Sequence, residues 1–440
     1  MYTQEGNRPY YYIHTFGCQM NDHDSERMAA LFELMGYKEG KSEEEASVIL
    51  LNTCAIREHA EERVYGFIGR LKHLKDDGMI LGVCGCMVQQ KHVLNKIKKS
   101  YPFVDMIFGT HNYANLPEYL LKALEGEKSV EILEDRQSIV EGIPALRSSK
   151  VSALVNIMEG CNNFCTYCIV PYTRGREKSR QADDIVAEIK KLVSKGTREV
   201  TLLGQNVNSY GKSLGETIDF PDLLEKINEI EGLYRLRFMT SHPKDLSSKL
   251  IEAMKLDKVC PSFHLPVQSG STKVLRAMNR NYSREEYLSK VKALKETVPG
   301  IGLTTDIIIG FPGEEEEDVD QTISLIEEVS FDSAYTFIYS KRPGTPAAKL
   351  EDKVSKEEKH KRFDRMLRNL NKIVIDKNKS REGQSYEVLI EEELSAGIYQ
   401  GRTPQGFLVR FPASSEDLGK LKKVTITKAK KFSLEGELCH

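Results

Sequence analysis

Three cysteines stand close together in the stretch GCNNFCTYC, at Cys161, Cys165 and Cys168. No further cysteine follows until Cys260. A structural zinc site is normally closed by four protein ligands, whereas a cubane iron-sulfur cluster held by three thiolates keeps one iron free to bind another molecule. The spacing Cys-x3-Cys-x2-Cys lets one tight loop direct three sulfurs at one cluster, and chance clustering of buried thiols is the alternative. We therefore predict an iron-sulfur cluster with one open iron on these residues, which we call the loop cysteines.

Three other cysteines are far apart in the sequence but occupy equivalent positions. Cys18, Cys54 and Cys86 each follow one of three short apolar runs by about one to three residues. If these runs are parallel strands, the loops beyond their carboxyl ends open on the same side of the sheet. Topology then brings the three thiols together. We predict a second three-thiolate site on these residues, the edge cysteines, with a role as ordinary small core residues as the alternative.

The remaining cysteines are Cys84, Cys260 and Cys439. Cys84 stands two positions before Cys86, inside or at the end of the apolar run, and its side chain could point to the same edge. We prefer Cys86 as the ligand because it lies in the predicted loop, and Cys84 is its competitor. Cys260 and Cys439 are isolated in the sequence, so we expect structural or incidental roles for them.

The edge cysteines belong to a predicted parallel sheet near the N-terminus. Residues 10–125 alternate short apolar runs with amphipathic stretches of helical spacing. The four runs span residues 11–15, 48–52, 79–83 and 106–108. This βαβα order predicts an α/β domain over residues 1–125, with helices on both faces of the sheet. The polar, Gly- and Pro-containing segment 126–150 is typical of a linker.

From residue 151 the alternation restarts with longer units. The apolar runs span residues 151–158, 199–203, 235–240, 262–267, 302–309 and 333–340. Helical patterns separate them, and six βα units favour an open, partial (β/α)6 barrel over the closed eight-unit form. The loop cysteines follow the first run, at the carboxyl mouth where barrel enzymes place their sites. We assign residues 151–380 to this domain.

The segment 381–440 changes character. Apolar and polar residues alternate between Gly and Pro turns, which predicts a small all-β module. Small barrels with basic faces commonly bind nucleic acid, although a charged strand surface is more often a solubility feature. The lysines of this module are Lys420, Lys422, Lys423, Lys428, Lys430 and Lys431.

Composition limits the class of protein. The chain has 440 residues, 40% of them hydrophobic, which suits roughly two to four domains with buried cores. The formal net charge of -2 excludes a strongly basic or acidic chain. The N-terminus lacks a basic region followed by an apolar run, and no long apolar stretch occurs, so we expect a cytoplasmic protein without a membrane partner. Nine cysteines in uneven clusters suit metal ligation in a reducing compartment better than a disulfide framework.

The motif MEGCNNFCTYC, after a predicted strand that opens a βα barrel, closely resembles the signature of radical S-adenosylmethionine enzymes. Together with TFGCQMN, LNTCAIRE and GCMVQ upstream, it resembles the methylthiotransferase family. Near the C-terminus, GIYQGRT and FLVRF are similar to an RNA-binding TRAM module. The resemblance covers essentially the whole chain, with a methylthiotransferase domain, a radical barrel and a TRAM module in that order.

The resemblance implies a division of labour between the two cysteine sets. In this family, a [4Fe-4S] cluster on the residues that match the loop cysteines binds S-adenosylmethionine and reduces it to methionine and a 5′-deoxyadenosyl radical. A fourth cysteine would occupy the iron that the cofactor chelates. The residues that match the edge cysteines hold an auxiliary cluster, [4Fe-4S] or of another nuclearity. Its sulfur is methylated and delivered to an adenine base of the substrate. A radical is needed because the adenine C2–H is too weak an acid for a side-chain base at neutral pH.

The resemblance also directs attention to polar residues near the ends of the barrel strands. Many members of the superfamily have Gly-Gly-Glu where this chain has LGQN, so Gln205 would accept a hydrogen bond from the methionine ammonium without carrying a charge. Arg280 would pair with the carboxylate of the cofactor, and Gln268 and Asp306 are further candidate contacts. Each of these side chains is equally suited to bracing a loop.

Within the family, several long motifs resemble those of the MiaB-type enzymes, bacterial tRNA methylthiotransferases that act on isopentenyladenosine beside the anticodon. They include VTLLGQNVNSYG, RFMTSHP, FHLPVQSGS and FIYSKRPGTPAA. The stretches PYTR and SHP favour this substrate over threonylcarbamoyladenosine in tRNA or an aspartate of a ribosomal protein, on which relatives act. The implied partners are tRNA, an electron donor, and a sulfur source or iron-sulfur assembly system. A non-catalytic, metal-containing RNA-binding protein is the alternative from another class.

Overall fold

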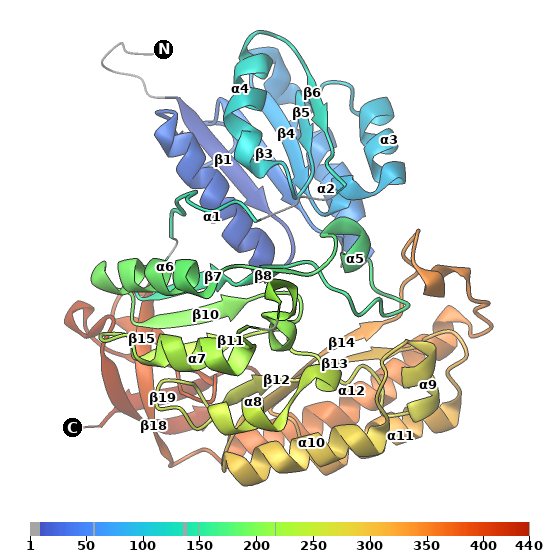
Figure 1. Cartoon of the computed structure of the whole chain (residues 1–440), viewed down its shortest axis with the longest axis vertical. Helices are drawn as coiled ribbons and strands as arrows, with labels where there is room; N and C mark the ends of the chain where they lie inside the picture. The colour runs from blue at the N-terminus through green and yellow to red at the C-terminus, as the bar shows by residue number, and fades with distance from the viewer. Residues whose placement is uncertain (1–8, 56–57, 135–138, 148, 216, 440) are drawn as a thin grey trace. The chain divides into compact units, whose positions relative to one another are not determined.

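The computed structural model describes residues 9–55, 58–134, 139–147, 149–215 and 217–439 (Figure 1). The chain divides into two compact units. The first comprises residues 1–148, 159–162 and 168–178, and the second comprises residues 149–158, 163–167 and 179–440. Within the described ranges, no helix is long and apolar enough to cross a membrane. The first eight residues, and residues 135–138 and 148 of the predicted linker, lie outside the described residues.

The first unit is built on a six-stranded sheet in which every neighbouring pair is parallel, in the order β2-β1-β3-β4-β5-β6. The strands are β1 (Tyr10–Thr15), β2 (Lys38–Glu39), β3 (Val48–Thr53), β4 (Ile80–Gly85), β5 (Met106–Phe108) and β6 (Ser129–Glu131). Four of them coincide with the predicted apolar runs, which confirms the α/β class. The short edge strands β2 and β6 contain no long apolar run and were therefore not predicted. Strand β6 pairs with β5 and lies near the start of the segment predicted as a linker.

Helices cover both faces of this sheet (Figure 1). They are α1 (Gln19–Leu34), α2 (Glu58–Arg70), α3 (Lys91–Ser100) and α4 (Leu116–Leu124), with the 3-10 turns η1 (Leu71–Asp77), η2 (Met87–Gln89) and η3 (Tyr113–Asn115). Val48 and Leu50 of β3 pack with α1 and α4, while Ile49 and Leu51 pack with α2 and α3. Successive side chains of a strand point to opposite faces, so β3 is buried along its whole length.

The second unit begins with six strands in two parallel groups, β11-β10-β7 and β12-β13-β14. They are β7 (Ser152–Asn156), β10 (Glu199–Leu203), β11 (Arg235–Phe238), β12 (Ser262–His264), β13 (Gly302–Ile309) and β14 (Ser333–Ile338). A bridge between Leu236 and Val259 links the two groups. All six strands fall within the predicted runs, and their order confirms the partial (β/α)6 barrel.

Amphipathic helices alternate with these strands and share one hydrophobic core with them. They are α6 (Ala182–Ser194), α7 (Phe220–Asn228), α8 (Ser248–Ala253), α9 (Thr272–Ala277), α10 (Arg284–Thr297), α11 (Glu316–Val329) and α12 (Lys356–Lys379). Several begin at the residue types that cap helices. At α10, Ser283 accepts a hydrogen bond from the Glu286 N–H and Glu286 accepts one from the Ser283 N–H, which satisfies two backbone donors at the helix start.

The C-terminal segment forms a closed barrel in the order β15-β16-β17-β19-β18, which confirms the predicted all-β module. Its strands are β15 (Ser385–Ser395), β16 (Ile398–Arg402), β17 (Leu408–Pro412), β18 (Leu421–Ala429) and β19 (Leu434–Leu438). This barrel packs on the rest of the second unit through buried arginines. Arg237 of β11 donates to the carbonyls of Thr403 at 2.7 Å and Pro404 at 2.8 Å, and it forms an ion pair with Glu199. Removing the module would leave this buried arginine without two of its partners.

Candidate active site

The edge cysteines lie at the carboxyl ends of three neighbouring strands of the first unit. Cys18 is the N-cap residue of α1, three positions after β1, while Cys54 directly follows β3 and Cys86 directly follows β4. Strands β1, β3 and β4 are adjacent and parallel, so their loops emerge at one edge of the sheet. The three thiols are close enough that Cys18 is hydrogen bonded to Cys54 and influences the ionisation of Cys86.

The backbone before Cys18 approaches the Cys54 side chain very closely. A Cβ atom at Gly17 would lie 2.4 Å from the Cβ and 2.7 Å from the sulfur of Cys54. Gly17 also has a φ of 116°, in the region that favours glycine. Only glycine therefore lets these two loops come together without a local shift.

The surroundings favour the thiolate form at Cys18. The hydrogen bond from Cys54 has the largest effect on the pKa of Cys18 and, with the charge of Arg174 and despite burial, lowers this pKa to about 6. Burial raises the pKa of Cys86, and the guanidinium of Arg174 opposes that rise. Thiolates are the form of cysteine that binds metals, so this edge of the sheet is prepared for a positively charged group.

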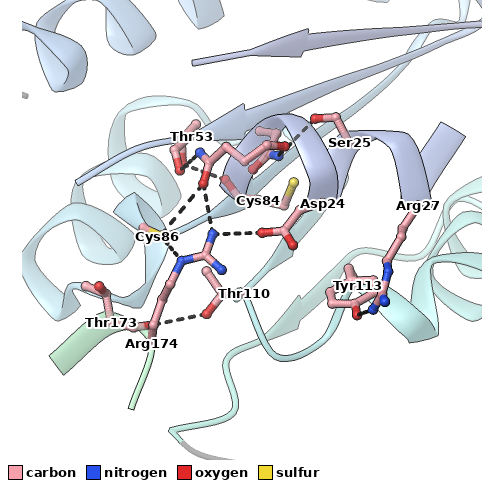
Figure 2. A network of polar contacts seen from close by, with 12 residues as sticks. Asp24, Ser25, Arg27, Thr53, Cys84, Cys86, Thr110, Tyr113, Thr173 and Arg174 are labelled. Atoms are coloured by element: carbon pink, nitrogen blue, oxygen red, sulfur yellow. Dashed lines mark hydrogen bonds and ion pairs between the residues drawn. The ribbon is translucent and has the colours of Figure 1, made fainter. Parts of the chain in front are cut away.

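Arg174, in the segment that follows Cys168, reaches the edge cysteine Cys86 (Figure 2). Its Nε donates to the sulfur of Cys86 at 3.2 Å. Its Nη2 donates to Oδ1 of Asn21 at 2.9 Å and to Oδ2 of Asp24 at 2.7 Å. The side chains of Arg174, Asn21 and Asp24 are all buried, so bulk water does not compete for these contacts.

The segment that carries this arginine packs on the same edge of the first unit. It forms the short helix α5 (Val170–Thr173), and the hydroxyl of Thr110 donates to the Thr173 carbonyl at 3.0 Å. Ile169, just before α5, belongs to a small buried cluster with Cys86. Both backbone and apolar contacts therefore hold the segment in place.

Cys84 is packed into the core instead of facing this edge. Its sulfur lies 3.8 Å from the sulfur of Met28, in the apolar cluster on the α1 and α4 side of the sheet. Burial raises the pKa of Cys84 well above its ordinary value, which disfavours the thiolate. These positions favour Cys86 over Cys84 as a metal ligand. Cys260 is also buried, and Cys439 is exposed near the C-terminus.

The residues at this edge fit an iron-sulfur cluster by their chemistry. Thiolates are the protein ligands that hold such clusters. Each of three separate loops supplies one thiol, and Nε of Arg174 donates to the Cys86 sulfur at 3.2 Å.

The loop cysteines directly follow β7 and the short strand β8 (Met158–Glu159). The first two are buried and the third is half-buried. At the base of the loop, the N–H of Cys161 donates to the Gly175 carbonyl at 3.2 Å. Gly160 has a φ of 75°, and a Cβ there would lie 2.1 Å from the Arg176 carbonyl oxygen. Close backbone contacts at Gly160 and Gly175 thus hold the two ends of the loop together.

Two nitrogen donors lie near the sulfur of Cys165 in the second unit. Nη1 of Arg280 is 3.6 Å from it and Nε2 of His242 is 4.0 Å from it. Nδ1 of His242 accepts the N–H of Lys244 at 3.2 Å, which leaves the ring proton on Nε2, the nitrogen that faces the sulfur. Burial lowers the pKa of His242 well below its ordinary value, so the ring is neutral.

Arg280 is buried and braces the neighbouring loops. Its Nε donates to the Tyr282 hydroxyl at 2.8 Å and its Nη2 donates to the Pro266 carbonyl at 2.6 Å. Among the described residues, none of its contacts is a carboxylate. The structure therefore places this predicted cofactor contact 3.6 Å from the Cys165 sulfur.

The other three candidate cofactor contacts follow or belong to barrel strands. Gln205 follows β10, and its buried Oε1 has no hydrogen-bond partner within the described structure. The carboxylate of Asp306 on β13 lies 3.5 Å from Nε2 of His264. Gln268 is buried, and its backbone N–H donates to the Asp306 carbonyl at 2.8 Å. Gln268 and Asp306 are thus neighbours, whereas Gln205 belongs to the other strand group.

Several loops after the barrel strands hold residues other than glycine in the left-handed region. Phe164 has a φ of 45°, Thr240 of 69° and Gln268 of 70°. Such a backbone costs about 1–3 kcal/mol and persists only where surrounding contacts enforce it. Strain of this kind concentrates at functional sites, and here it occurs in the loops after β7, β11 and β12.

An aromatic pair is exposed on β14. Tyr335 and Phe337 are 57% and 45% exposed and pair in register with Asp306 and Ile308 of β13. The opposite face of β13, which includes Ile307, packs against the helices of the unit. The aromatic pair therefore lies on the face opposite to that of Ile307, beside Asp306. Exposed aromatic side chains on a sheet are suited to stacking nucleobases.

Comparisons with known proteins agree with this architecture. Three family models match consecutive parts of the chain: uncharacterized protein family UPF0004 at residues 10–109, the radical SAM superfamily at 155–326 and the TRAM domain at 379–439. A relative from Clostridium perfringens (strain SM101 / Type A), named tRNA-2-methylthio-N(6)-dimethylallyladenosine synthase, is 53% identical over 432 residues, 97% of either chain. The chain belongs to this synthase family. A relative of the same name from Thermoanaerobacter sp. (strain X514) is 51% identical and covers 99% of this chain and 93% of its own.

Solved structures share the fold of this synthase-family chain at low sequence identity. The radical S-adenosylmethionine methyltransferase TsrM from Kitasatospora setae, with cobalamin and a [4Fe-4S] cluster, has a TM-score of 0.57 at 13% identity, over 78% of this chain and 77% of its own. The cobalamin-dependent radical enzyme OxsB has a TM-score of 0.53 at 12% identity, over 83% of this chain and 56% of its own. These likenesses concern the fold alone.

Sequence reasoning missed three features of the synthase-family site. Arg174 and His242 lie in the stretches PYTR and SHP, which in the sequence indicate only the choice of substrate. Their contacts with cysteine sulfurs depend on folding, and the only local signal is an arginine six positions after Cys168. The aromatic pair on β14 resembles any apolar strand in sequence, and only its exposure distinguishes it.

Proposed function

We propose that this enzyme adds a methylthio group to C2 of N6-isopentenyladenosine next to the anticodon of tRNA. The observation that supports this most is the identity of 51–53%, along nearly the whole chain, with synthases of that name. The two cysteine sets agree with the proposal, because inserting sulfur at an unactivated carbon requires a radical source and a separate sulfur-bearing site.

The loop cysteines would hold the [4Fe-4S] cluster with the open iron, and the edge cysteines would hold the auxiliary cluster. When bound, these groups and S-adenosylmethionine supply the radical chemistry and the sulfur. The chain's own residues orient them. Arg280 and His242 direct N–H groups toward Cys165, and Arg174 donates to Cys86. Such contacts behind the ligands fix ligand orientation and tune the bound group.

The second unit offers a surface for the base. The exposed pair Tyr335 and Phe337 lies beside Asp306, on the face of the sheet opposite to that of Ile307. Sequence-specific proteins recognise single-stranded RNA loops by stacking splayed bases on aromatic rings and reading their edges with polar groups. We place a base of the anticodon loop on this pair, with Asp306 near its polar edge.

The C-terminal barrel would bind the tRNA backbone. Lys422 forms an ion pair with Asp417 at 3.0 Å, and Lys430 pairs with Glu435, so these lysines are partly neutralised. Phosphate contacts of exposed lysines position RNA without reading its sequence. In the described structure, the lysines of this module that are exposed and outside any ion pair are Lys420, Lys423 and Lys428.

Further partners follow from the chemistry. An electron donor must reduce the loop-cysteine site in each catalytic cycle, and a sulfur source or iron-sulfur assembly system must restore the sulfur that leaves the auxiliary site. Since tRNA is the substrate, we place the enzyme in the cytoplasm.

The deciding experiment is mass spectrometry of tRNA nucleosides from cells with and without this protein. We expect 2-methylthio-N6-isopentenyladenosine to disappear without it and N6-isopentenyladenosine to accumulate. Complementation with the intact chain should restore the methylthio nucleoside, and complementation with Cys161→Ala should not. A methylthio group lost from threonylcarbamoyladenosine instead, or an unchanged nucleoside profile, would contradict the proposal.

A further inference from the structure

We infer that Arg174 is the positioning residue of the edge-cysteine site, where it orients the Cys86 sulfur and, with Asp24, sets the charge around the three thiolates. The inference rests on one part of the proposed function, namely that the edge cysteines hold an iron-sulfur cluster. Arg174 is not a metal ligand in this assignment, since a guanidinium has donors only and remains protonated in proteins.

The contacts of Arg174 connect to all three edge loops. Asn21 receives the guanidinium on Oδ1, and its Nδ2 donates to the carbonyls of Phe16 at 2.8 Å and Thr53 at 3.0 Å. These carbonyls belong to the loops of Cys18 and Cys54, and they fix the orientation of the Asn21 amide. The N–H of Cys86 also donates to the Thr53 carbonyl at 2.9 Å. One buried network therefore spans the three loops (Figure 2).

The charges of the network explain the need for both Arg174 and Asp24. Three thiolates at one buried edge would repel one another, and a cation beside them reduces that cost. Arg174 supplies this cation, since its Nε lies 3.2 Å from the Cys86 sulfur. A buried guanidinium in turn needs a partner, and Asp24, whose side chain is only 9% exposed, supplies it.

A planar guanidinium suits this position better than an ammonium group. Its Nε and Nη2 point in fixed, different directions, so one side chain donates to the Cys86 sulfur and to two oxygens at once. Hydrogen bonds to cluster sulfurs and nearby positive charge raise the reduction potential of iron-sulfur clusters. Loss of Arg174 should therefore lower the potential of the auxiliary cluster, and loss of the Asp24 charge should raise it.

The test uses the full-length chain with the loop cysteines replaced by alanine, so that iron and spectra report the edge site alone. Into this background we would introduce Arg174→Met, Arg174→Lys and Asp24→Asn. The matched control is Arg27→Met, because Arg27 is also a buried arginine of the first unit, and its described hydrogen bonds are to the Tyr113 hydroxyl at 2.7 Å and the Val140 carbonyl at 3.3 Å (Figure 2). After anaerobic reconstitution, iron content, the midpoint potential and the melting temperature are measured.

We expect Arg174→Met to lose more than half of the bound iron and to shift the potential of the remaining cluster downward. Arg174→Lys should retain more iron than Arg174→Met, because lysine keeps the positive charge although it lacks the two separate donor groups of the guanidinium. Asp24→Asn should shift the potential upward. Arg27→Met should keep the iron content and the potential of the background protein, even if it melts earlier. A purely structural role for Arg174 predicts lower melting temperatures without potential shifts of opposite sign.

Two results would overturn the inference: unchanged iron content and potential in Arg174→Met, or shifts of the same direction in Arg174→Met and Asp24→Asn. If Arg174→Met does not fold, the potentials of the lysine and asparagine variants decide the question in its place. The intact holoenzyme is assayed in parallel on tRNA that contains isopentenyladenosine. A failure of that holoenzyme to form the methylthio nucleoside would refute the proposed function, whereas the potentials test the role of Arg174 alone.

Discussion

The loop cysteines and the edge cysteines, the two sets proposed to hold iron-sulfur clusters, present three thiols through opposite architectures. The loop cysteines fall within residues 161–168, in a loop whose base is closed by tight backbone contacts. The edge cysteines are spread over residues 18–86 and meet only because three parallel strands end at one edge. The first set depends on the conformation of one loop, while the second depends on the register of a whole sheet.

The two sets also differ in their buried arginines. Arg174 donates to Cys86 and is balanced by Asp24. Arg280 lies beside Cys165, and its other partners in the described structure are a hydroxyl and a carbonyl. Arg174 thus has a carboxylate partner, whereas no carboxylate is among the described hydrogen-bond partners of Arg280, and this leaves Arg280 suited to an anionic ligand such as a cofactor carboxylate.

The largest effect should come from removing each cysteine set in turn. Alanine at all three loop cysteines should abolish 5′-deoxyadenosine formation while the auxiliary cluster still assembles. Alanine at all three edge cysteines should abolish the methylthio product while some reductive cleavage of S-adenosylmethionine continues. Quantifying both products by mass spectrometry checks this separation. Loss of all cleavage in the second variant, with the first cluster present by spectroscopy, would show that the two sites do not work separately.

Two glycine substitutions, one at each site, should distort the two sites in the same way, because each adds a Cβ where the backbone is closely packed. Gly17→Ala places a Cβ 2.4 Å from the Cys54 Cβ, and Gly160→Ala places one 2.1 Å from the Arg176 carbonyl oxygen. Each change also forces alanine to a positive φ, so we expect a loss of at least about 1–2 kcal/mol of stability.

Each glycine variant should lose iron from its own site and retain iron at the other. Iron analysis and 5′-deoxyadenosine formation distinguish the two outcomes. Gly36→Ala is the matched control, because Gly36 also has a positive φ but nothing lies within 4 Å of the added Cβ. Equal loss of both clusters in either test variant would argue that the sites are structurally coupled.

A smaller effect should come from lysine substitutions in the C-terminal barrel, which change tRNA binding without changing the chemistry at either cysteine set. Glutamine at Lys420, Lys423 and Lys428 should weaken tRNA binding and reduce the slope of log affinity against log salt by about 0.7–0.9 for each phosphate that is no longer neutralised. The control is glutamine at Lys422 and Lys430, which are paired with acids. Filter binding over a range of salt measures both slopes, while cofactor cleavage without tRNA should stay unchanged. Equal slopes in the two variants would contradict the assignment of the three lysines.

The smallest effect should come from Cys84→Ala. This change removes one buried sulfur that packs against Met28, so we expect a loss of about 1 kcal/mol in the free energy of unfolding. Iron content at both sites should be unchanged, because the Cys84 side chain lies in the core of the first unit. Denaturant unfolding and iron analysis test this. A loss of auxiliary iron in Cys84→Ala would exchange the roles of Cys84 and Cys86.

The sequence by itself determined the features that depend on local patterns. The spacing of the loop cysteines, the alternation of apolar runs and helical stretches, and the all-β segment after residue 380 are all encoded within short windows. The equivalent positions of the edge cysteines were also readable, because every parallel strand of a sheet ends at the same edge. The two short edge strands of the first sheet escaped prediction, since β2 and β6 gain their hydrogen bonds from neighbouring strands and not from a pattern of their own.

Only the tertiary structure decided which side chains surround the sulfurs. Arg174 is 88 residues from Cys86 along the chain, and His242 is 77 residues from Cys165. The difference between Cys84 in the core and Cys86 at the edge is likewise a matter of packing. The physical reason is that a local pattern specifies backbone conformation and the buried face of an element, whereas the partners of a buried polar side chain come from whichever distant segments fold against it.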